Sequence, residues 1–174
     1  MAQQTLARDR IVRLLDQAEG FLMLDLPERA LGILTSRPDW ATMPFEAGLL
    51  TGEALRALGR HREAIPPLET AHKLRPGDLG AAVALGWCYK RTHRLAQAID
   101  ALETAARKHP AEPLLRYNLA CYWSLAQNPA RALDELATAL SLDPEFRARI
   151  ATEPDFQALR GHPEFERLAE GAAA

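Results

Sequence analysis

The sequence contains few cysteines, no long apolar run and no marked excess of either charge. Its two cysteines, Cys88 and Cys121, are too few for a disulfide framework, and we expect both to be small, reduced side chains inside helices. The formal net charge of -2 gives no electrostatic reason to expect nucleic acid or an anionic membrane as a partner. No apolar stretch approaches the length of a membrane span.

Targeting and catalytic motifs are also missing. The first ten residues contain no cationic segment followed by an apolar core, so the sequence predicts no secretory signal and a cytoplasmic location. The five histidines are dispersed, and no two have the spacing that places a pair of metal ligands on one helical face. There is no glycine-rich phosphate loop and no GxSxG turn. We therefore predict that the protein is not an enzyme and has no metal site and no cofactor.

The most informative feature present is an internal repeat with a period of 34 residues. A leucine recurs at this spacing, and so do several small residues and a proline. The aligned sets are Leu68, Leu102 and Leu136; Ala64, Ala98 and Ala132; Ala71, Ala105 and Ala139; Gly52, Gly86 and Ala120; and Pro76, Pro110 and Pro144. The period predicts helical hairpins that stack on one another, because one hairpin cannot bury its own apolar face. The small residues allow the helices to cross closely, and the prolines end the second helix of each hairpin.

The period divides the chain into three clear repeats and one degenerate repeat. The clear repeats are 45–78, 79–112 and 113–146, and the degenerate one is 11–44, whose second helix is cut short by Pro38. Pro66 and Pro67 predict a bent or late-starting helix in the second half of 45–78. The helices are expected near 6–25, 27–36, 45–58, 61–74, 79–92, 95–108, 113–126 and 129–142.

The tail, 147–174, lies outside the period and contains a short duplication. Pro154-Asp155-Phe156 and Pro163-Glu164-Phe165 each combine a proline with an acidic residue, which is typical of a helix start. We expect two short helices here that cap the last repeat with an apolar inner face, followed by a frayed Gly-Ala-Ala-Ala end.

The sequence from Tyr117 to Trp123, with the Ala-Leu pairs at 132–133 and 139–140 and the closing Leu142-Asp143-Pro144, resembles the tetratricopeptide-repeat (TPR) family. The resemblance implies an all-α fold, a right-handed α-α superhelix of about four helical hairpins with a C-terminal capping segment. Residues 1–146 would form the TPR domain. Members of the family are scaffolds, cochaperones, secretion chaperones and regulators, so the resemblance implies a protein-binding function without naming the partner.

One well-defined group within the family grips the C-terminal carboxylate of a chaperone with lysine, arginine and asparagine side chains. In this sequence, both possible registers lack a cation at the corresponding positions, and only Asn118 fits. A receptor for chaperone tails is therefore not expected.

In this fold, the first helix of each repeat lines the concave face, where a partner would bind. The row at equivalent positions, Leu15, Leu49, Val83 and Tyr117, is apolar throughout, and Trp87 and Tyr117 are the candidate aromatic anchors. Glu19 and Glu53 at one end, with Lys90 towards the other, would orient a ligand. The predicted partner-binding residues are Leu15, Glu19, Leu49, Glu53, Arg56, Val83, Trp87, Lys90, Tyr117 and Cys121.

Several interpretations remain open from the sequence. The leading one is a protein-interaction module that holds a peptide or helix of another protein in its groove. The alternatives are a dedicated chaperone for a secreted or aggregation-prone client, and a self-assembling structural protein. Trp87 could also serve packing alone, and residues 1–10 could cover Leu15 and Leu49 in the free protein.

Overall fold

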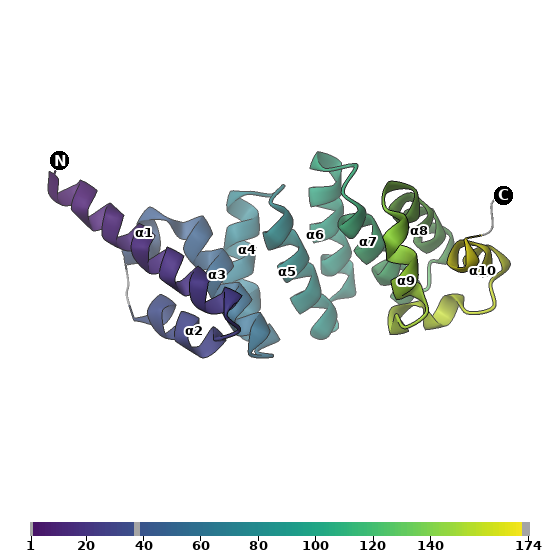
Figure 1. The fold of residues 1–174 in the computed structure, drawn as a ribbon, viewed down its shortest axis with the longest axis horizontal. Coiled ribbons are helices and arrows are strands. Elements are labelled where there is room, and N and C mark those ends of the chain that lie inside the picture. The colour runs from purple at the N-terminus through teal and green to yellow at the C-terminus, as the bar shows by residue number, and fades with distance from the viewer. Residues whose placement is uncertain (1, 37–38, 172–174) are drawn as a thin grey trace. The chain divides into compact units, whose positions relative to one another are not determined.

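A computed structural model describes residues 2–36 and 39–171. Within these ranges the chain is helical and contains no strand (Figure 1). It forms two compact units, 1–92 and 93–174, whose boundary falls in the turn of the third repeat. The helices of unit 1 are α1 (Ala2–Met23), α2 (Pro27–Thr35), α3 (Pro44–Ala57), α4 (His61–Leu74) and α5 (Leu79–Arg91), with a 3-10 turn, η1 (Asp39–Thr42), before α3. Unit 2 contains α6 (Leu95–Lys108), α7 (Pro113–Leu125), α8 (Pro129–Leu142) and the tail elements.

The helix starts follow the start signals in the sequence. Proline occupies the first turn of α2, α3, α7 and α8, where its missing N–H has no partner to lose. Asp78 caps α5 by accepting a hydrogen bond from the backbone N–H of Ala81 at 2.9 Å, and Asn128 caps α8 in the same way. The eight predicted helices are confirmed; α1 differs most, because it begins at Ala2, four residues before the predicted start.

The hairpin turns share one backbone device. A residue with positive φ ends the first helix of each hairpin, at Asp25, Gly59, His93 and Gln127, and these positions are again 34 apart. After three of these helices, the N–H of the residue that follows the positive-φ residue donates a hydrogen bond to the carbonyl five residues earlier, as from Arg60 to Leu55 at 2.8 Å. This bond is that of a Schellman motif, which satisfies carbonyls that the helix end would leave open. The 34-residue period is therefore present in the backbone geometry of the turns as well as in the core.

Unit 1 packs through small residues where its helices cross. Gly52 of α3 faces Leu68 of α4 so closely that a Cβ at Gly52 would lie 2.2 Å from the Leu68 Cγ. Leu68 and Ala64 are fully buried, as expected for the repeat core. Of the two alternatives predicted for this helix, bent or late-starting, the late start is wrong, because α4 begins at His61 and contains Pro66 and Pro67 inside it. Both prolines lie on the less buried side of α4, where the carbonyls they leave unpaired can reach water.

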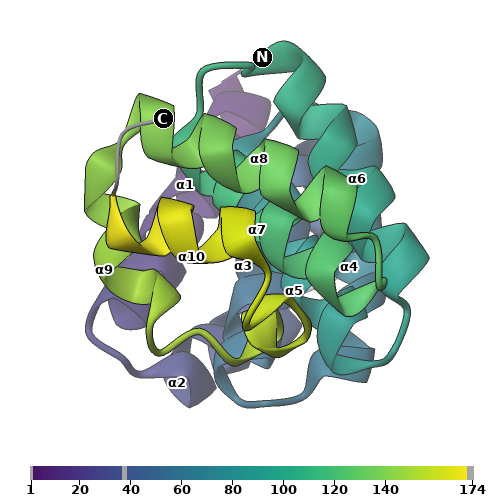
Figure 2. The ribbon, with the colours of Figure 1, turned by 90° about the vertical axis from the view of Figure 1, so that its right-hand side faces the viewer.

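The tail of unit 2 covers the last hairpin. It contains η2 (Pro144–Phe146), α9 (Arg147–Ile150), the 3-10 segment η3 (Pro154–Leu159) and α10 (Pro163–Glu170). η3 packs on α7, and α10 packs on α8 and α9, as Figure 2 shows in light green and yellow. Phe156 and Phe165, the two phenylalanines of the duplicated motif, are fully buried, with ring centroids 5.6 Å apart. The tail has the apolar inner face of a cap; the first of its two predicted helices is a 3-10 segment. The predicted fraying concerns 172–174, outside the described residues.

Candidate functional site

The candidate site in unit 1 is the surface formed by the first helices of its repeats, α1, α3 and α5, which we call the α1–α3–α5 face. α3 packs against both α1 and α5, so the three helices are neighbours in space. A pocket of about 150 Å³ lies between α1 and the start of α3. Its lining residues are Val12, Leu15, Asp16, Glu19, Met43, Phe45, Glu46, Leu49 and Leu50. The pocket therefore combines an apolar floor with carboxylates at its edge.

Three of the predicted site residues meet at this pocket. Leu15 is 4% exposed and belongs to its floor, Leu49 is half-buried, and Glu19 is exposed. Residues 2–10 are the beginning of α1, so they do not form a separate segment that folds back over Leu15 and Leu49. The α1 end of the face is thus apolar at its base and acidic at its rim.

Several residues of this pocket are not among the predicted site residues. Phe45 and Glu46 lie one helical turn before Leu49 and Leu50, and Val12 and Asp16 flank Leu15 on α1. Their spacing of three or four residues from predicted positions is the signal that could have found them. Glu46 forms an ion pair with Arg75 at 2.6 Å, and the Arg75 guanidinium lies over the Phe45 ring at 3.8 Å. These contacts fix the wall of the pocket that α3 provides.

Trp87 is the large exposed aromatic residue of α5. It occupies the repeat position of Glu19 and Glu53, and 41% of its surface is exposed. The Lys90 ammonium lies 5.1 Å from the centre of its ring, a cation–π contact that joins two of the predicted site residues. Val83, one turn earlier, is half-buried. The α5 end of the face therefore presents an aromatic surface beside a positive charge.

Glu53 and Arg56 form a pair on α3, between the two ends of the face. The Arg56 guanidinium contacts the Glu53 carboxylate at 2.6 Å, and both side chains are partly exposed. Cys88 of α5 lies behind them: burial raises the pKa of its thiol to about 11, while the charges of Arg56 and Glu53 act in opposite directions. A thiol with this pKa is almost entirely protonated at neutral pH and is not a nucleophile.

Tyr117 and Cys121, the predicted site residues of unit 2, are core side chains. Each is 3% exposed. The ring of Tyr117 packs on Phe146 at 4.9 Å and on Phe156 at 5.6 Å, so the tail covers the position that the sequence left open to a partner. Tyr117 is therefore a buried side chain and not the surface anchor that the sequence predicted. The sequence could not show it, because Phe146 and Phe156 lie outside the aligned apolar positions of the repeats.

Cys121 has carboxylate neighbours from the tail. Its Sγ and a carboxylate oxygen from each of Glu153 and Asp155 all lie within 4.8 Å of one another. Asp155 is buried, and Glu153 accepts a hydrogen bond from the backbone N–H of Asp155 at 3.2 Å. Sulfur and carboxylate oxygen are ligand atoms that several divalent metals accept.

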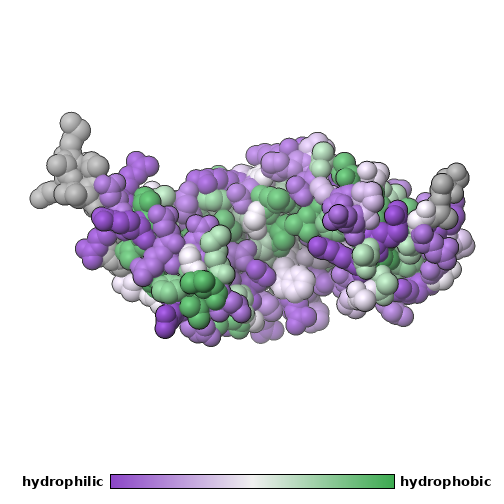
Figure 3. All heavy atoms as spheres, in the orientation of Figure 1, coloured by the Kyte–Doolittle hydropathy of each residue, from purple (hydrophilic) through white to green (hydrophobic). Residues whose placement is uncertain are grey.

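Hydrophobic surface also occurs away from the α1–α3–α5 face. Figure 3 shows an apolar patch over the end of unit 1 that contains α2 and the turn before it. Near this turn, Met23 at the end of α1 is 83% exposed and Leu24 is 70% exposed. In the described part of the chain, no helix has both the length and the apolar character needed to cross a bilayer.

Comparison with known proteins agrees with the repeat pattern. The model of the tetratricopeptide-repeat family matches residues 55–120. No curated protein matches the chain in sequence. Among solved structures, MamA 41-end from Desulfovibrio magneticus RS-1 is similar over 95% of this chain and 98% of its own, with 20% identity and a TM-score of 0.70.

Two further structures have the same fold. A crystal structure of MamA covers 88% of this chain and 90% of its own, at 17% identity and a TM-score of 0.74. The structure of YrrB, described as a TPR protein with an unusual peptide-binding site, covers 78% of this chain and 70% of its own, at 18% identity and a TM-score of 0.70. The chain thus has the all-α superhelical fold of helical-repeat proteins. Its central part, residues 55–120, matches the tetratricopeptide-repeat family.

Proposed function

We propose that the protein is a non-enzymatic interaction module, and that the α1–α3–α5 face binds a peptide or helix of a partner protein. The observation on which the proposal rests is Trp87, an aromatic side chain left 41% exposed at the repeat position equivalent to that of Glu19, which lines the pocket. Aromatic residues of this kind supply a large share of the binding energy at interfaces. YrrB supports the proposal by analogy, since it is a TPR protein with a peptide-binding site.

The chemistry of the face defines the kind of ligand. The pocket between α1 and α3 fits one apolar side chain, because its volume is about 150 Å³. Asp16 and Glu19 make that end acidic, whereas Lys90 and Arg91 make the α5 end basic. An extended or helical segment with an apolar anchor, a cationic residue near it and an acidic residue further along would match this distribution.

The test uses peptides selected from a random display library against the whole chain, with affinities measured by calorimetry. Trp87→Ala should weaken binding by about 2 kcal/mol or more, roughly thirtyfold, because a central anchor is lost. Leu49→Ala should also weaken peptide binding, because it removes a side chain that lines the pocket. Glu19→Gln and Lys90→Gln should have smaller effects that fade at high salt, since exposed charges are screened.

The matched control is Leu74→Ala. Leu74 is a large apolar residue, 49% exposed, near the end of α4 rather than on the proposed face. Normal binding by folded Trp87→Ala and Leu49→Ala, with loss of binding by Leu74→Ala, would assign the ligand to another surface. The other candidate functions have their own signatures: a dedicated chaperone should co-purify with one aggregation-prone client, and a self-assembling protein should change size with concentration.

A further inference from the structure

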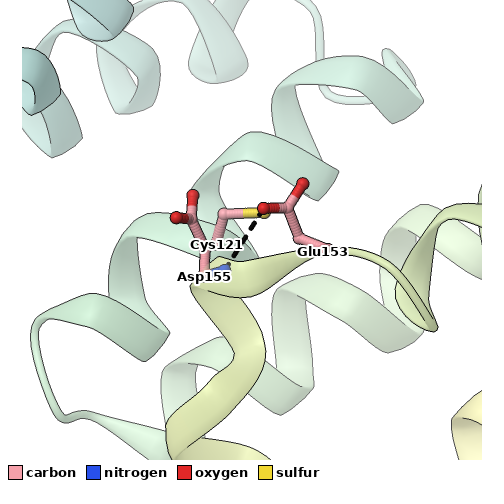
Figure 4. Close-up of side chains that lie close together, drawn as sticks. All are labelled: Cys121, Glu153 and Asp155. Carbon is pink, nitrogen blue, oxygen red and sulfur yellow. Dashed lines mark hydrogen bonds between the residues drawn. The ribbon is translucent and has the colours of Figure 1, made fainter.

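Cys121, Glu153 and Asp155 bring three ligand atoms together from two separate parts of the chain. Cys121 belongs to α7, and the two carboxylates come from the start of η3, more than thirty residues later. Figure 4 shows the carboxylates of Glu153 and Asp155 on either side of the Cys121 side chain. All three ligand atoms lie within 4.8 Å of one another, and both Cys121 and Asp155 are more than nine-tenths buried. Two carboxylates held this close in a partly buried site repel each other, and a bound cation would relieve that repulsion.

The Tyr117 hydroxyl is a second and independent observation at the same place. Tyr117 lies one helical turn before Cys121, so the two side chains share a face of α7. Its hydroxyl is buried and has no hydrogen-bond partner in the described structure. A buried hydroxyl normally has a partner, and this one lies on the Cys121 face of α7 without one.

We propose that Cys121, Glu153 and Asp155 bind one zinc ion. In a tetrahedral site with Zn–S near 2.3 Å and Zn–O near 2.0 Å, the ligand atoms lie roughly 3.3–3.8 Å apart, so rotation of the two carboxylates closes the site. Water occupies the fourth position, and the Tyr117 hydroxyl forms a hydrogen bond with it. The thiolate selects zinc over magnesium and calcium, which prefer oxygen ligands. Binding converts the thiol to a thiolate and releases its proton to the solvent.

The metal would fasten the tail to the last repeat. Ser124, one turn after Cys121, already donates a hydrogen bond to the Asp155 carbonyl at 2.7 Å, and Phe156 is fully buried next to it. A zinc ion at this site would join the same two elements through their side chains. This proposal concerns unit 2 and does not depend on a partner binding to unit 1.

The experiment is a titration of the full-length, tag-free apoprotein with Zn²⁺ and, separately, with Co²⁺. We expect one Zn²⁺ per chain, release of about one proton per metal, measured by calorimetry in buffers of different ionisation enthalpy, and a rise in melting temperature with Zn²⁺ concentration. Co²⁺ should give an intense thiolate-to-cobalt charge-transfer band, and excess Mg²⁺ or Ca²⁺ should not displace either metal.

The variants separate this site from adventitious binding. Glu153→Gln keeps the oxygen that caps Asp155 but loses the ionic ligand, and it should weaken Zn²⁺ binding by about tenfold or more. Cys121→Ser should abolish the charge-transfer band. Cys88→Ala, which removes the other buried cysteine, should bind as the wild type does. Absence of Zn²⁺ binding by the wild type, or undiminished binding by folded Cys121→Ser and Glu153→Gln, overturns the proposal.

Discussion

The contact between Gly52 and Leu68 sets the spacing of α3 and α4, and a pair of glycine variants can measure it. Gly52→Ala would place a Cβ 2.2 Å from the Cγ of Leu68, which is fully buried and has no room to retreat. Gly32 of α2 is the matched control, because a Cβ there meets nothing within 4 Å. Replacing glycine by alanine inside a helix stabilises it by about 0.5–1 kcal/mol. Gly32→Ala should therefore increase the free energy of unfolding by that amount.

Gly52→Ala should gain the same helix stabilisation, but its new methyl group overpacks the contact with Leu68, which costs about 1–3 kcal/mol in a filled core. Subtracting the change in unfolding free energy of one variant from that of the other cancels the helix stabilisation. The remainder should equal the overpacking cost of about 1–3 kcal/mol. Urea denaturation of wild type and both variants, followed by circular dichroism, gives the three free energies. Equal stabilisation by both substitutions would contradict the close crossing of α3 and α4, and with it the role of the small residue that the repeat conserves in register.

Three further predictions follow from other parts of the structure. Phe156→Ala should destabilise unit 2 by about 3–5 kcal/mol because it leaves a cavity under the cap, whereas exposed Gln157→Ala should be nearly neutral in the same urea experiment. Gln127→Gly should stabilise the protein by about 1 kcal/mol, since Gln127 has a φ of 56° that glycine adopts without strain; an unchanged melting temperature would contradict this. Folding raises the pKa of the Cys88 thiol from 9.0 to about 11, so the thiol ionises first in the unfolded state and stability should fall between pH 9 and 11. Cys88→Ala should lose this part of the pH dependence, measured from urea midpoints.

The repeat period predicted the fold because the core residues, the helix ends and the turns of the hairpins all recur with it. The aligned leucines and alanines are buried, the helix ends lie where the prolines and turn residues place them, and the positive-φ residues recur with the same spacing. Each of these signals is local or involves neighbouring repeats, so the sequence displays them directly. The position of Pro66 and Pro67 is an exception, because tertiary packing keeps α4 continuous where local preference favours a break.

The sites were harder to predict because they depend on contacts between segments that share no period. The pocket of unit 1 uses Phe45 and Met43, which lie at the entry to α3 and not at the aligned groove positions. The cluster at Cys121 depends on Glu153 and Asp155, which approach only after the tail has folded onto α7. A search for metal ligands by spacing along one helix finds neither carboxylate, because the three ligands are separated by a turn, a helix and part of the tail.

The same repeat position is buried to different degrees in different repeats. Leu49 and Val83 are half-buried on the α1–α3–α5 face, whereas Tyr117 at the equivalent position is covered by Phe146 and Phe156. A terminal repeat must close the apolar side that an inner repeat gives to its neighbour, so the tail uses Tyr117 as part of its own core. The repeat pattern therefore predicts which helix face each repeat presents, and the non-periodic segments decide how much of that face remains exposed. In this chain the exposed aromatic residue on that face is Trp87, which is why the binding experiments are centred on unit 1.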